Sequence, residues 1–481
     1  MSIAAALSNA ASGLAVVSRA TDVVSANVAN ALTPGYGRRA VVLASAGNGS
    51  GVRIASVERL VSASLLADSR LAAARLGGDE VRAAFRTGIE AALGLRTDGA
   101  ALTDKISALE ADLVAATARP DNPLRLTAVA SSAAELVSAV RSAAGAVSAA
   151  RTEADRGIAS DVATLRSGLT EVARLNRAII VDQANGRDAA ALIDARQQVI
   201  DSLSSIVAIR EVPRENGRVA LFTQGGAMLL DGETPVDLDF HPAGQLTPAM
   251  SVGTPPVSRL AMGGEEIDGR LMSLFAGGTL EAHFAVRDRL APEAQARLDA
   301  FARDLCDRFA DPSLDPSLAT GAPGLFTDAG AAADPAQELG LANRLALHAA
   351  IDPPGTADWR LRDGLGAAAP GDEGSSVLLA ALADRLGASR PTASAALSPG
   401  SRSTARLAAE IGAMVSTERV AAKAASTRSA VHADALAGQL LADGVDTDHE
   451  MQRLLELEKA YAANAKVIMA ADAMISRILE I

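Results

Sequence analysis

The sequence predicts a mainly α-helical protein, with an elongated helical-bundle body, N- and C-terminal helices paired as a coiled coil, and one small β-hairpin or meander region. Three observations predict this fold class. Apolar residues recur at helical spacing over most of the 481 residues, and both ends of the chain carry heptad patterns. Aromatic residues make up only 2% of the chain although hydrophobic residues make up 49%. Such a composition suits helix packing better than thick sheet sandwiches.

The C-terminal segment, residues 446–481, is expected to form one long helix. Acidic residues open it, and neither Gly nor Pro interrupts it. Its apolar positions alternate in spacing between three and four residues: Leu454, Leu457, Tyr461, Asn464, Ile468, Ala471, Ile475 and Ile478. Such a helix is about 45 Å long. A seam of this length needs a partner along the whole helix.

The N-terminal segment, residues 1–35, offers that partner. Its seam has the same spacing: Ile3, Leu7, Ala10, Leu14, Val17, Thr21, Val24, Val28 and Ala31. Small residues in one seam against large residues in the other favour close interdigitation. We expect the two ends to meet in an antiparallel or bundled coiled coil, with the rest of the chain looped out between them. Two amphipathic helices buried separately in a globular core explain the periodicity equally well.

Asn464 is the one strongly polar residue in the C-terminal seam. It fixes the register of the helix, or it points into a polar lumen or toward solvent. Both terminal helices gain little from helix propensity alone, since ordering costs about 1–2 kcal/mol per residue in backbone entropy. We therefore expect residues 2–30 and 452–481 to order only when neighbouring subunits cover the seams.

The chain between the ends divides into three parts. Residues 36–205 and 280–445 are expected to form the helical body, which begins with a hairpin or extended arm at 39–58. Residues 206–279 form a small β-rich segment with a tight turn at Asn216-Gly217. Residues 311–402 are rich in Pro, Gly and Asp and predict an irregular surface insert with two short helices, at 339–350 and 376–386. We expect residues 60–440 to fold without the ends.

Composition argues against several classes of partner. The net charge of −12 and the presence of only four lysines disfavour binding to nucleic acid or anionic lipid. No run of about 18 apolar residues predicts a membrane span, and the N-terminus lacks the features of a cleaved signal peptide. The single cysteine, Cys306, excludes an internal disulfide and is expected to be a buried, inert thiol.

The sequence contains no pattern typical of catalysis. Its five histidines lack metal-ligand spacing, and no phosphate-binding or dinucleotide-binding fingerprint is present. We expect no enzymatic activity, cofactor or metal. A secreted enzyme whose site assembles only in space is an open alternative.

Two stretches resemble the axial proteins of the bacterial flagellum, the family of rod, hook and hook-associated subunits. The first is SANVANALTPGY at 25–36, whose matching residues are Asn27, Asn30, Pro34, Gly35 and Tyr36. The second is the C-terminal pattern from Gly444 onward, with Ala460-Tyr461 and Ala463-Asn464-Ala465-Lys466 in place. The two stretches lie at the distances from the chain ends that this family shows.

A third stretch is similar to one branch of that family, the hook–filament junction proteins (hook-associated protein 1). It comprises Leu175-Asn176 and the segment 192–207, LIDARQQVIDSLSSIV. Many members of this branch carry a larger folded outer domain where this chain has only residues 311–402.

The resemblance implies a structural protein that is exported unfolded through the flagellar type III apparatus and assembles as a ring, with its terminal helices lining the inner tube. It implies as partners further copies of the chain, the hook protein, a second junction protein on the filament side, and a cytosolic export chaperone at the C-terminal region. It places the protein in the extracellular flagellum, and in the cytoplasm before export. The alternatives are a hook or rod subunit, which tends to be β-rich between its terminal helices, and a cytoplasmic helical coiled-coil scaffold.

Overall fold

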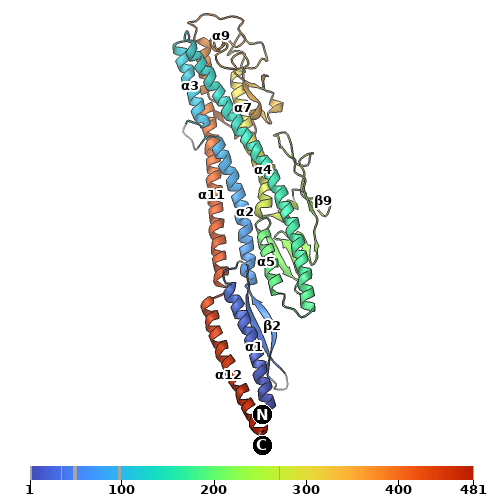
Figure 1. Cartoon of the computed structure of the whole chain (residues 1–481). Helices are drawn as coiled ribbons and strands as arrows, with labels where there is room; N and C mark the ends of the chain where they lie inside the picture. The colour runs from blue at the N-terminus through green and yellow to red at the C-terminus, as the bar shows by residue number, and fades with distance from the viewer. Residues whose placement is uncertain (1–2, 34, 47–50, 96–98, 270, 480–481) are drawn as a thin grey trace.

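The protein is a long, thin, mainly helical molecule with both chain ends at the same tip (Figure 1). The computed structural model describes residues 3–33, 35–46, 51–95, 99–269 and 271–479. It confirms the predicted fold class. The helices are α1 (Ile3–Ala29), α2 (Ala63–Ala92), α3 (Leu102–Ala118), α4 (Pro123–Ala184), α5 (Ala190–Ser204), α6 (Gly278–Ala285), α7 (Ala291–Phe309), α8 (Leu341–Arg344), α9 (Arg360–Asp363), α10 (Val377–Gly387), α11 (Thr404–Ala442) and α12 (Thr447–Leu479).

Shorter elements join these helices. A π-helical turn, η2 (Val286–Leu290), makes α6 and α7 one continuous run, and 3-10 turns lie at Leu271–Phe275 and Pro335–Gln337. The strands are β1 (Arg38–Ser45), β2 (Val52–Leu60), β3 (Ile209–Pro213), β4 (Val219–Thr223), β5 (Met228–Asp231), β6 (Thr234–Pro235), β7 (Leu238–Asp239), β8 (Ala261–Met262), β9 (Glu265–Glu266), β10 (Phe326–Asp328), β11 (Leu345–Leu347), β12 (Arg390–Pro391) and β13 (Ser401–Arg402).

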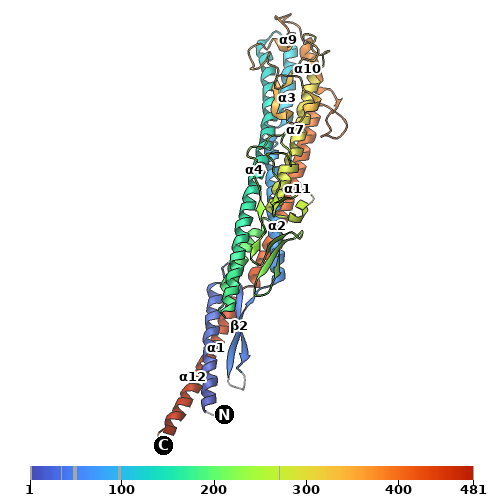
Figure 2. The ribbon, with the colours of Figure 1, turned by 90° about the vertical axis from the view of Figure 1, so that its right-hand side faces the viewer.

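The terminal helices α1 and α12 pack side by side and antiparallel, below the body (Figures 1 and 2). Asn27 contacts Glu450, and Gly13 lies against Asn464. Because both contacts are 14 positions apart on each helix, the two helices keep one register over about 21 Å. The predicted pairing of the ends is confirmed in its antiparallel form. The alternative of two helices buried separately in a globular core is wrong.

The hairpin β1–β2 lies beside α1 rather than within the helical body. Its antiparallel register shifts between Val42 and Leu43, which marks a bulge. The backbone N–H of Val52 donates to Ser12 Oγ at 3.3 Å and so ties β2 to α1. The hairpin at 39–58 was expected from its alternating pattern, but its packing against the terminal pair was not.

The 62-residue helix α4 is the spine of the body, about 93 Å long. It starts where Asn122 caps the Leu124 N–H and Pro123 occupies the first turn. Its upper half belongs to one hydrophobic core, with α3, α7, α10 and α11. Its lower half belongs to a second core, with α5, α6 and strands β3, β4, β5 and β7. The shared spine holds the two cores in line and makes the molecule long.

The β-rich segment lies against the lower half of α4. Strands β3, β4, β5 and β6 form one antiparallel sheet, and β7, β8 and β9 form another. Asn216 and Gly217 have φ of 56° and 68°, the left-handed conformation that a tight hairpin turn needs. The turn was expected there from the Asn-Gly pair.

The expectation of a surface insert at 311–402 is wrong in one respect. Phe326, Leu345, Leu361 and Leu382 from this segment are at most 4% exposed and belong to the upper core. The segment forms the tip of the body, packed on α3, α4 and α7. The helix expected at 339–350 is one turn, α8, followed by strand β11, which pairs with β10. The helix expected at 376–386 is α10.

Helix α1 is long and apolar enough to cross a membrane, whereas the sequence was expected to contain no such segment. Among the described helices it has the length and mean hydropathy of a membrane span, by length and composition alone. In this structure it instead contacts α12 and the hairpin. That the protein has no membrane partner stays a prediction.

Candidate functional site

The predicted seams meet only in part within one subunit. On α1, Ala10, Val17 and Val24 are buried, while Ile3, Leu7, Leu14, Thr21 and Val28 are half-buried, as is Ala31 in the turn after the helix. On α12, Ala471 is buried and Leu454, Leu457, Asn464 and Ile468 are half-buried. Tyr461, Ile475 and Ile478 remain 52%, 39% and 61% exposed. Assembly through these residues stays a prediction, with part of the seam already covered by the chain's own partner helix.

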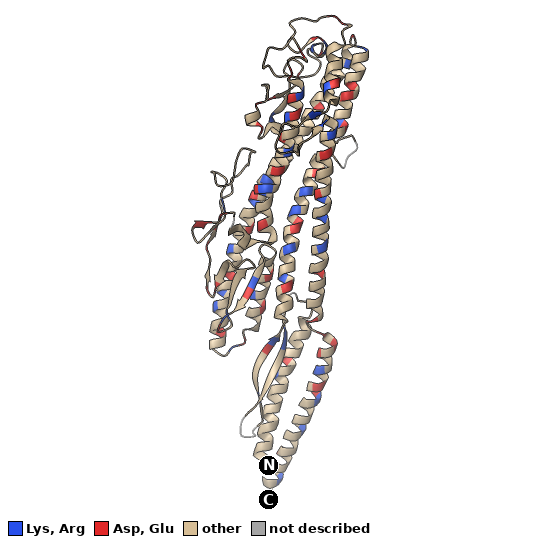
Figure 3. Ribbon diagram, turned by 180° about the vertical axis from the view of Figure 1, so that it is seen from behind, with Lys and Arg blue, Asp and Glu red and all other residues tan. Residues whose placement is uncertain are grey.

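Helix α12 also exposes apolar residues outside the predicted seam. Met451, Leu455, Val467, Met469 and Met474 are 44–62% exposed. Its last twenty described residues, 460–479, contain only three charged side chains, and Figure 3 shows this end of the molecule almost free of charge. A helix that is apolar on all sides is normally buried. The low charge of residues 460–479 is the sequence feature that indicates these additional exposed apolar residues.

Asn27 organises a polar network where the terminal pair meets the hairpin. Its fully buried side chain accepts from Tyr36 Oη at 2.9 Å and from Arg39 N at 3.0 Å. It donates to Arg39 O at 2.8 Å and to Glu450 Oε2 at 3.2 Å. Glu450, itself 1% exposed, accepts from Arg38 Nε at 2.8 Å. One amide therefore holds the end of α1, the start of β1 and the start of α12 together.

Asp194 on α5 joins this network to the body. Its carboxylate accepts from Arg39 Nη2 at 2.8 Å, from Arg59 Nε at 2.7 Å and from Gly37 N at 3.2 Å. Since Arg39 and Arg59 lie on β1 and β2, the carboxylate anchors both strands of the hairpin. We call the set Asn27, Tyr36, Arg38, Arg39, Arg59, Asp194 and Glu450 the joint network.

The rest of the loop motif shapes the turn into the hairpin. Gly35 has φ of 76°, and a Cβ there would lie 2.6 Å from Gln198 Cγ on α5, so glycine is required. Burial raises the pKa of Tyr36, although its ring lies 5.0 Å from the Arg39 guanidinium, which opposes the shift. Asn30 Nδ2 bonds Ala26 O of its own helix at 2.9 Å. Pro34 lies outside the described residues.

The third sequence stretch has a separate structural role. Asn176 Nδ2 on α4 donates to Val219 O at 3.0 Å and to Gly232 O at 2.5 Å. Arg196 Nη1 on α5 donates to Asn176 Oδ1 at 2.8 Å and to Gly217 O at 2.7 Å. These buried side chains attach the sheet to the two helices. The stretch thus supplies Asp194 for the joint and Arg196 for the sheet from the same helix.

Sequence reasoning missed most of the joint network. Glu450 was interpreted as an acid stabilising a helix start, whereas its main partners are Arg38 and Asn27. Asp194 lies within the third stretch, at 192–207, but the sequence gives no indication of its ion pairs with Arg39 and Arg59. Local pattern could not find these contacts, because 423 residues separate Asn27 from Glu450 and 155 separate Arg39 from Asp194.

The buried acidic side chains of this region form ion pairs that hold the elements together. Within the described ranges, no group of three or more His, Cys, Asp or Glu side chains could hold a metal ion. Burial raises the pKa of Cys306 to about 12, which keeps the thiol protonated and unreactive near neutral pH.

Comparisons with known proteins identify three segments of the chain. Residues 89–312 match the helical domain of the flagellar hook-associated protein FlgK. Residues 437–481 match the C-terminal region of the flagellar basal body rod proteins FlgEFG, and residues 7–36 match the flagella basal body rod protein family. A search of curated protein sequences found no match.

One similar solved structure is the flagellar hook junction protein FlgK from Burkholderia pseudomallei, with 20% sequence identity and a TM-score of 0.44. The alignment covers 54% of this chain and 46% of that protein, so this chain spans about half the length of that relative. The joint network has members in all three matched segments. Asn27 and Tyr36 lie in the N-terminal match, Asp194 lies in the helical-domain match, and Glu450 lies in the C-terminal match. Three segments of the chain thus match families of flagellar axial proteins: two rod-type terminal segments lie on either side of a segment that matches the helical domain of the hook-associated protein FlgK.

Proposed function

We propose that this chain is a structural subunit of the bacterial flagellum that joins the hook to the filament and assembles through α1 and α12. The observation that carries the proposal is the exposed apolar surface of α12. Ile478, Met469 and Tyr461 are more than half exposed, on a helix that projects below the body. Large apolar surfaces on a soluble subunit mark contact sites. Neighbouring subunits would cover this surface.

The joint network gives the assembly a defined geometry. A tube built from terminal helices needs a fixed direction between each helix pair and its body. Glu450, Asn27 and Asp194 link the pair, the hairpin and α5 through buried charge-assisted hydrogen bonds, which are stronger than neutral ones. The proposed role is mechanical and involves no catalysis, cofactor, nucleic acid or membrane.

The same surface suits the proposed route to the junction. We propose export of the unfolded chain through the flagellar apparatus, with a cytosolic chaperone covering the C-terminal apolar residues before export. A chain with a single cysteine needs no internal disulfide to be broken before export or re-formed after it. Outside the cell, the proposed neighbours are further copies in a ring, the hook protein below and a second junction protein on the filament side.

Deletion of the gene tests the proposal. The expected result is a cell that builds hooks but no filaments and releases filament protein into the medium. Complementation with Ile478→Asp should restore secretion of the chain but not filament growth. The matched control is Val431→Asp on α11, a site with 64% exposure against 61% for Ile478, which should restore both. A deletion strain without hooks would indicate a rod or hook subunit instead. Normal filaments on the deletion strain would contradict the proposal.

A further inference from the structure

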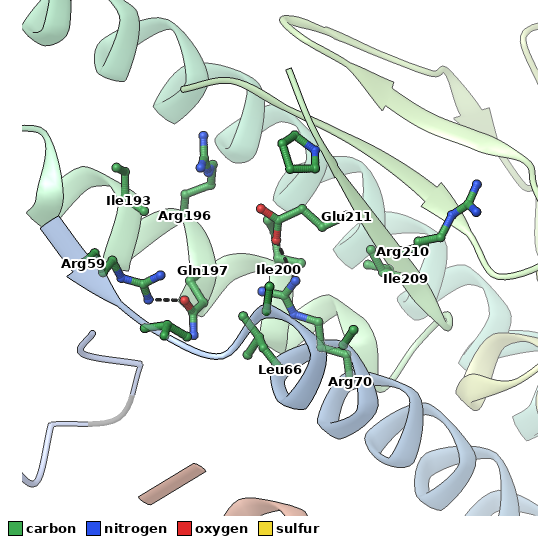
Figure 4. Close-up of a pocket in the computed structure, with 14 residues that line it drawn as sticks. Arg59, Leu66, Arg70, Ile193, Arg196, Gln197, Ile200, Ile209, Arg210 and Glu211 are labelled. Atoms are coloured by element: carbon green, nitrogen blue, oxygen red, sulfur yellow. Dashed lines mark hydrogen bonds and ion pairs between the residues drawn. The ribbon is translucent and has the colours of Figure 1, made fainter. Parts of the chain in front are cut away.

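An arginine-lined pocket of about 200 Å³ lies at the base of the body, between the end of β2, the start of α2, α5 and β3 (Figure 4). A cavity of about 150 Å³ accepts benzene, so this pocket has room for one side chain. Arg59, Arg70, Arg196, Arg210 and Glu211 are the charged residues that line it. The joint network and the sheet attachment use Arg59 and Arg196, but neither explains the pocket itself.

Positive charge exceeds negative charge around the pocket. Asp194 pairs with Arg59, and Asp201 and Glu211 pair with Arg70. Among the described residues, Arg196 and Arg210 make no ion pair. Arg210 is exposed beside the ring of Phe222. The site is therefore basic on a chain whose net charge is −12.

Two buried guanidinium groups are suited to an incoming acid. Arg70 is 4% exposed, and its Nη2 is buried without a hydrogen-bond partner, although Nε and Nη1 bind Asp201 and Glu211 at 2.6 and 2.7 Å. Figure 4 shows the Arg70 side chain reaching from α2 into the space below Glu211. Arg196 is 5% exposed, and burial lowers its pKa because a buried charge is disfavoured. A carboxylate in the pocket would offset both costs.

An acidic segment lies at a similar height on another flank of the molecule. The turn between α11 and α12 carries Asp443 and Asp446, and the first turn of α12 carries Asp448; all three are exposed. None of the three forms an ion pair within the part of the chain that the structure describes. We call them the acidic linker. Helix α2 stands between α11 and α5, so the acidic linker cannot enter the pocket of its own subunit (Figure 1).

We propose that the pocket binds an aspartate carboxylate from the acidic linker of a neighbouring copy of this chain. The inference rests on the proposed function, in which copies stand side by side in a ring. A ring needs two different patches on each subunit that complement one another. The pocket and the acidic linker are two such patches, opposite in charge and both near the boundary between the body and the terminal pair.

Cysteine cross-linking in assembled flagella tests this inference. The chain with Arg210→Cys and Asp448→Cys should form a ladder of covalent oligomers with a short bifunctional maleimide, and a second pair uses Asp443→Cys. Neither single variant should do so, and Cys306 is 2% exposed and should not react. The matched control pairs Arg210→Cys with Asp434→Cys, an exposed aspartate on α11 about 14 Å above Asp443. That control should lose the ladder.

The outcomes separate the inference from the proposed function. Absence of the chain from sheared flagella would overturn the proposed function. Its presence there without a ladder from either pair would overturn the inference alone. A product that joins Arg210→Cys to the hook protein would also overturn it, because the acid would come from another partner.

Exchange of the two charges gives a second test of the inference. Arg210→Asp and Asp448→Arg should each reduce the fraction of hooks bearing filaments, and the double variant should recover it.

Discussion

The side-chain amide of Asn27 lies 3.2 Å from the carboxylate of Glu450, 423 residues further along the chain. This contact closes the chain on itself, because it binds the end of the first helix to the start of the last. Arg38 forms an ion pair with the same Glu450 carboxylate, and Asp194 on α5 pairs with Arg39 and so connects the network to the body. The direction of the terminal pair thus depends on a few buried polar side chains.

Asn27→Ala should loosen this end of the pair. It would remove the hydrogen bonds of Asn27 with Arg39 N, Tyr36 Oη and Glu450 Oε2, and each such loss typically costs about 1–3 kcal/mol. Glu450 would keep Arg38 as its one remaining partner in the joint network. We expect local opening to become about 2 kcal/mol easier, roughly thirtyfold in the exchange rates of amides 447–454. Asn30→Ala is the control, since Asn30 bonds only along its own turn. Equal effects of both variants would show that Asn27 has no special role.

Gly13 should be required where α1 faces Asn464. A Cβ at position 13 would lie 2.8 Å from Asn464 Nδ2 and 3.1 Å from its Cγ. Gly13→Leu should therefore abolish pairing and filament attachment, Gly13→Ala should weaken them, and Asn464→Ala should rescue Gly13→Ala. The measurement is the fraction of hooks that bear filaments.

Gly145→Ala on α4 is the matched control. A Cβ at Gly145 would meet nothing within 4 Å, so this variant should stabilise the body by up to about 1 kcal/mol. If Gly13→Leu behaves like wild type, Asn464 does not set the register against α1.

The body should fold without the terminal pair, and the cost of substituting Asp194 should then largely disappear. A fragment of residues 61–442 lacks Gly37, Arg39 and Arg59, so the Asp194 carboxylate loses its ion-pair partners together with the hairpin that covers it. In the full chain, Asp194→Asn should destabilise by about 3 kcal/mol, because it breaks two buried ion pairs. In the fragment, where the hairpin no longer covers Asp194, the same substitution should change the stability by no more than about 0.5 kcal/mol. Denaturant unfolding of the four proteins measures both effects. A fragment that precipitates or shows no cooperative transition would place the ends within the core.

The free tip of the terminal pair should be unprotected in a dilute monomer. The sequence predicts disorder over all of residues 2–30 and 452–481. Because the joint network holds the end of α1 and the start of α12, we now expect disorder only toward the free tip of the pair. Beyond Glu450, Ala471 is the one buried residue described on α12, so little holds the lower halves of the two helices. Amides of 3–15 and 464–479 should exchange rapidly, and those near 27 and 450 more slowly. Uniform protection along both helices would contradict this.

Local signals predicted the long elements well. Periodicity placed α12, expected at 446–481, within about two residues and α10, expected at 376–386, within one, because such helices show one apolar face repeatedly. The Asn216-Gly217 turn followed from backbone sterics alone. The tip at 311–402 was misjudged because its apolar runs are too short to show a period, although residues such as Leu361 and Leu365 are buried in the core.

The site was harder to predict than the fold. The seams indicated which faces of α1 and α12 meet, but not that Ile475 and Ile478 extend past the contact within one subunit. Asp194, Arg39 and Arg59 carried no local pattern, since ion pairs between distant elements depend on how those elements pack. The loop motif pointed to Asn27 and Tyr36 without saying what they hold.

The proposed role of this chain is to join the hook to the filament. Immunogold electron microscopy of isolated flagella, with antibody against the body, tests it most directly. We expect a single band of label where the hook meets the filament. Label along the hook, on the rod, or absent from flagella altogether would contradict it.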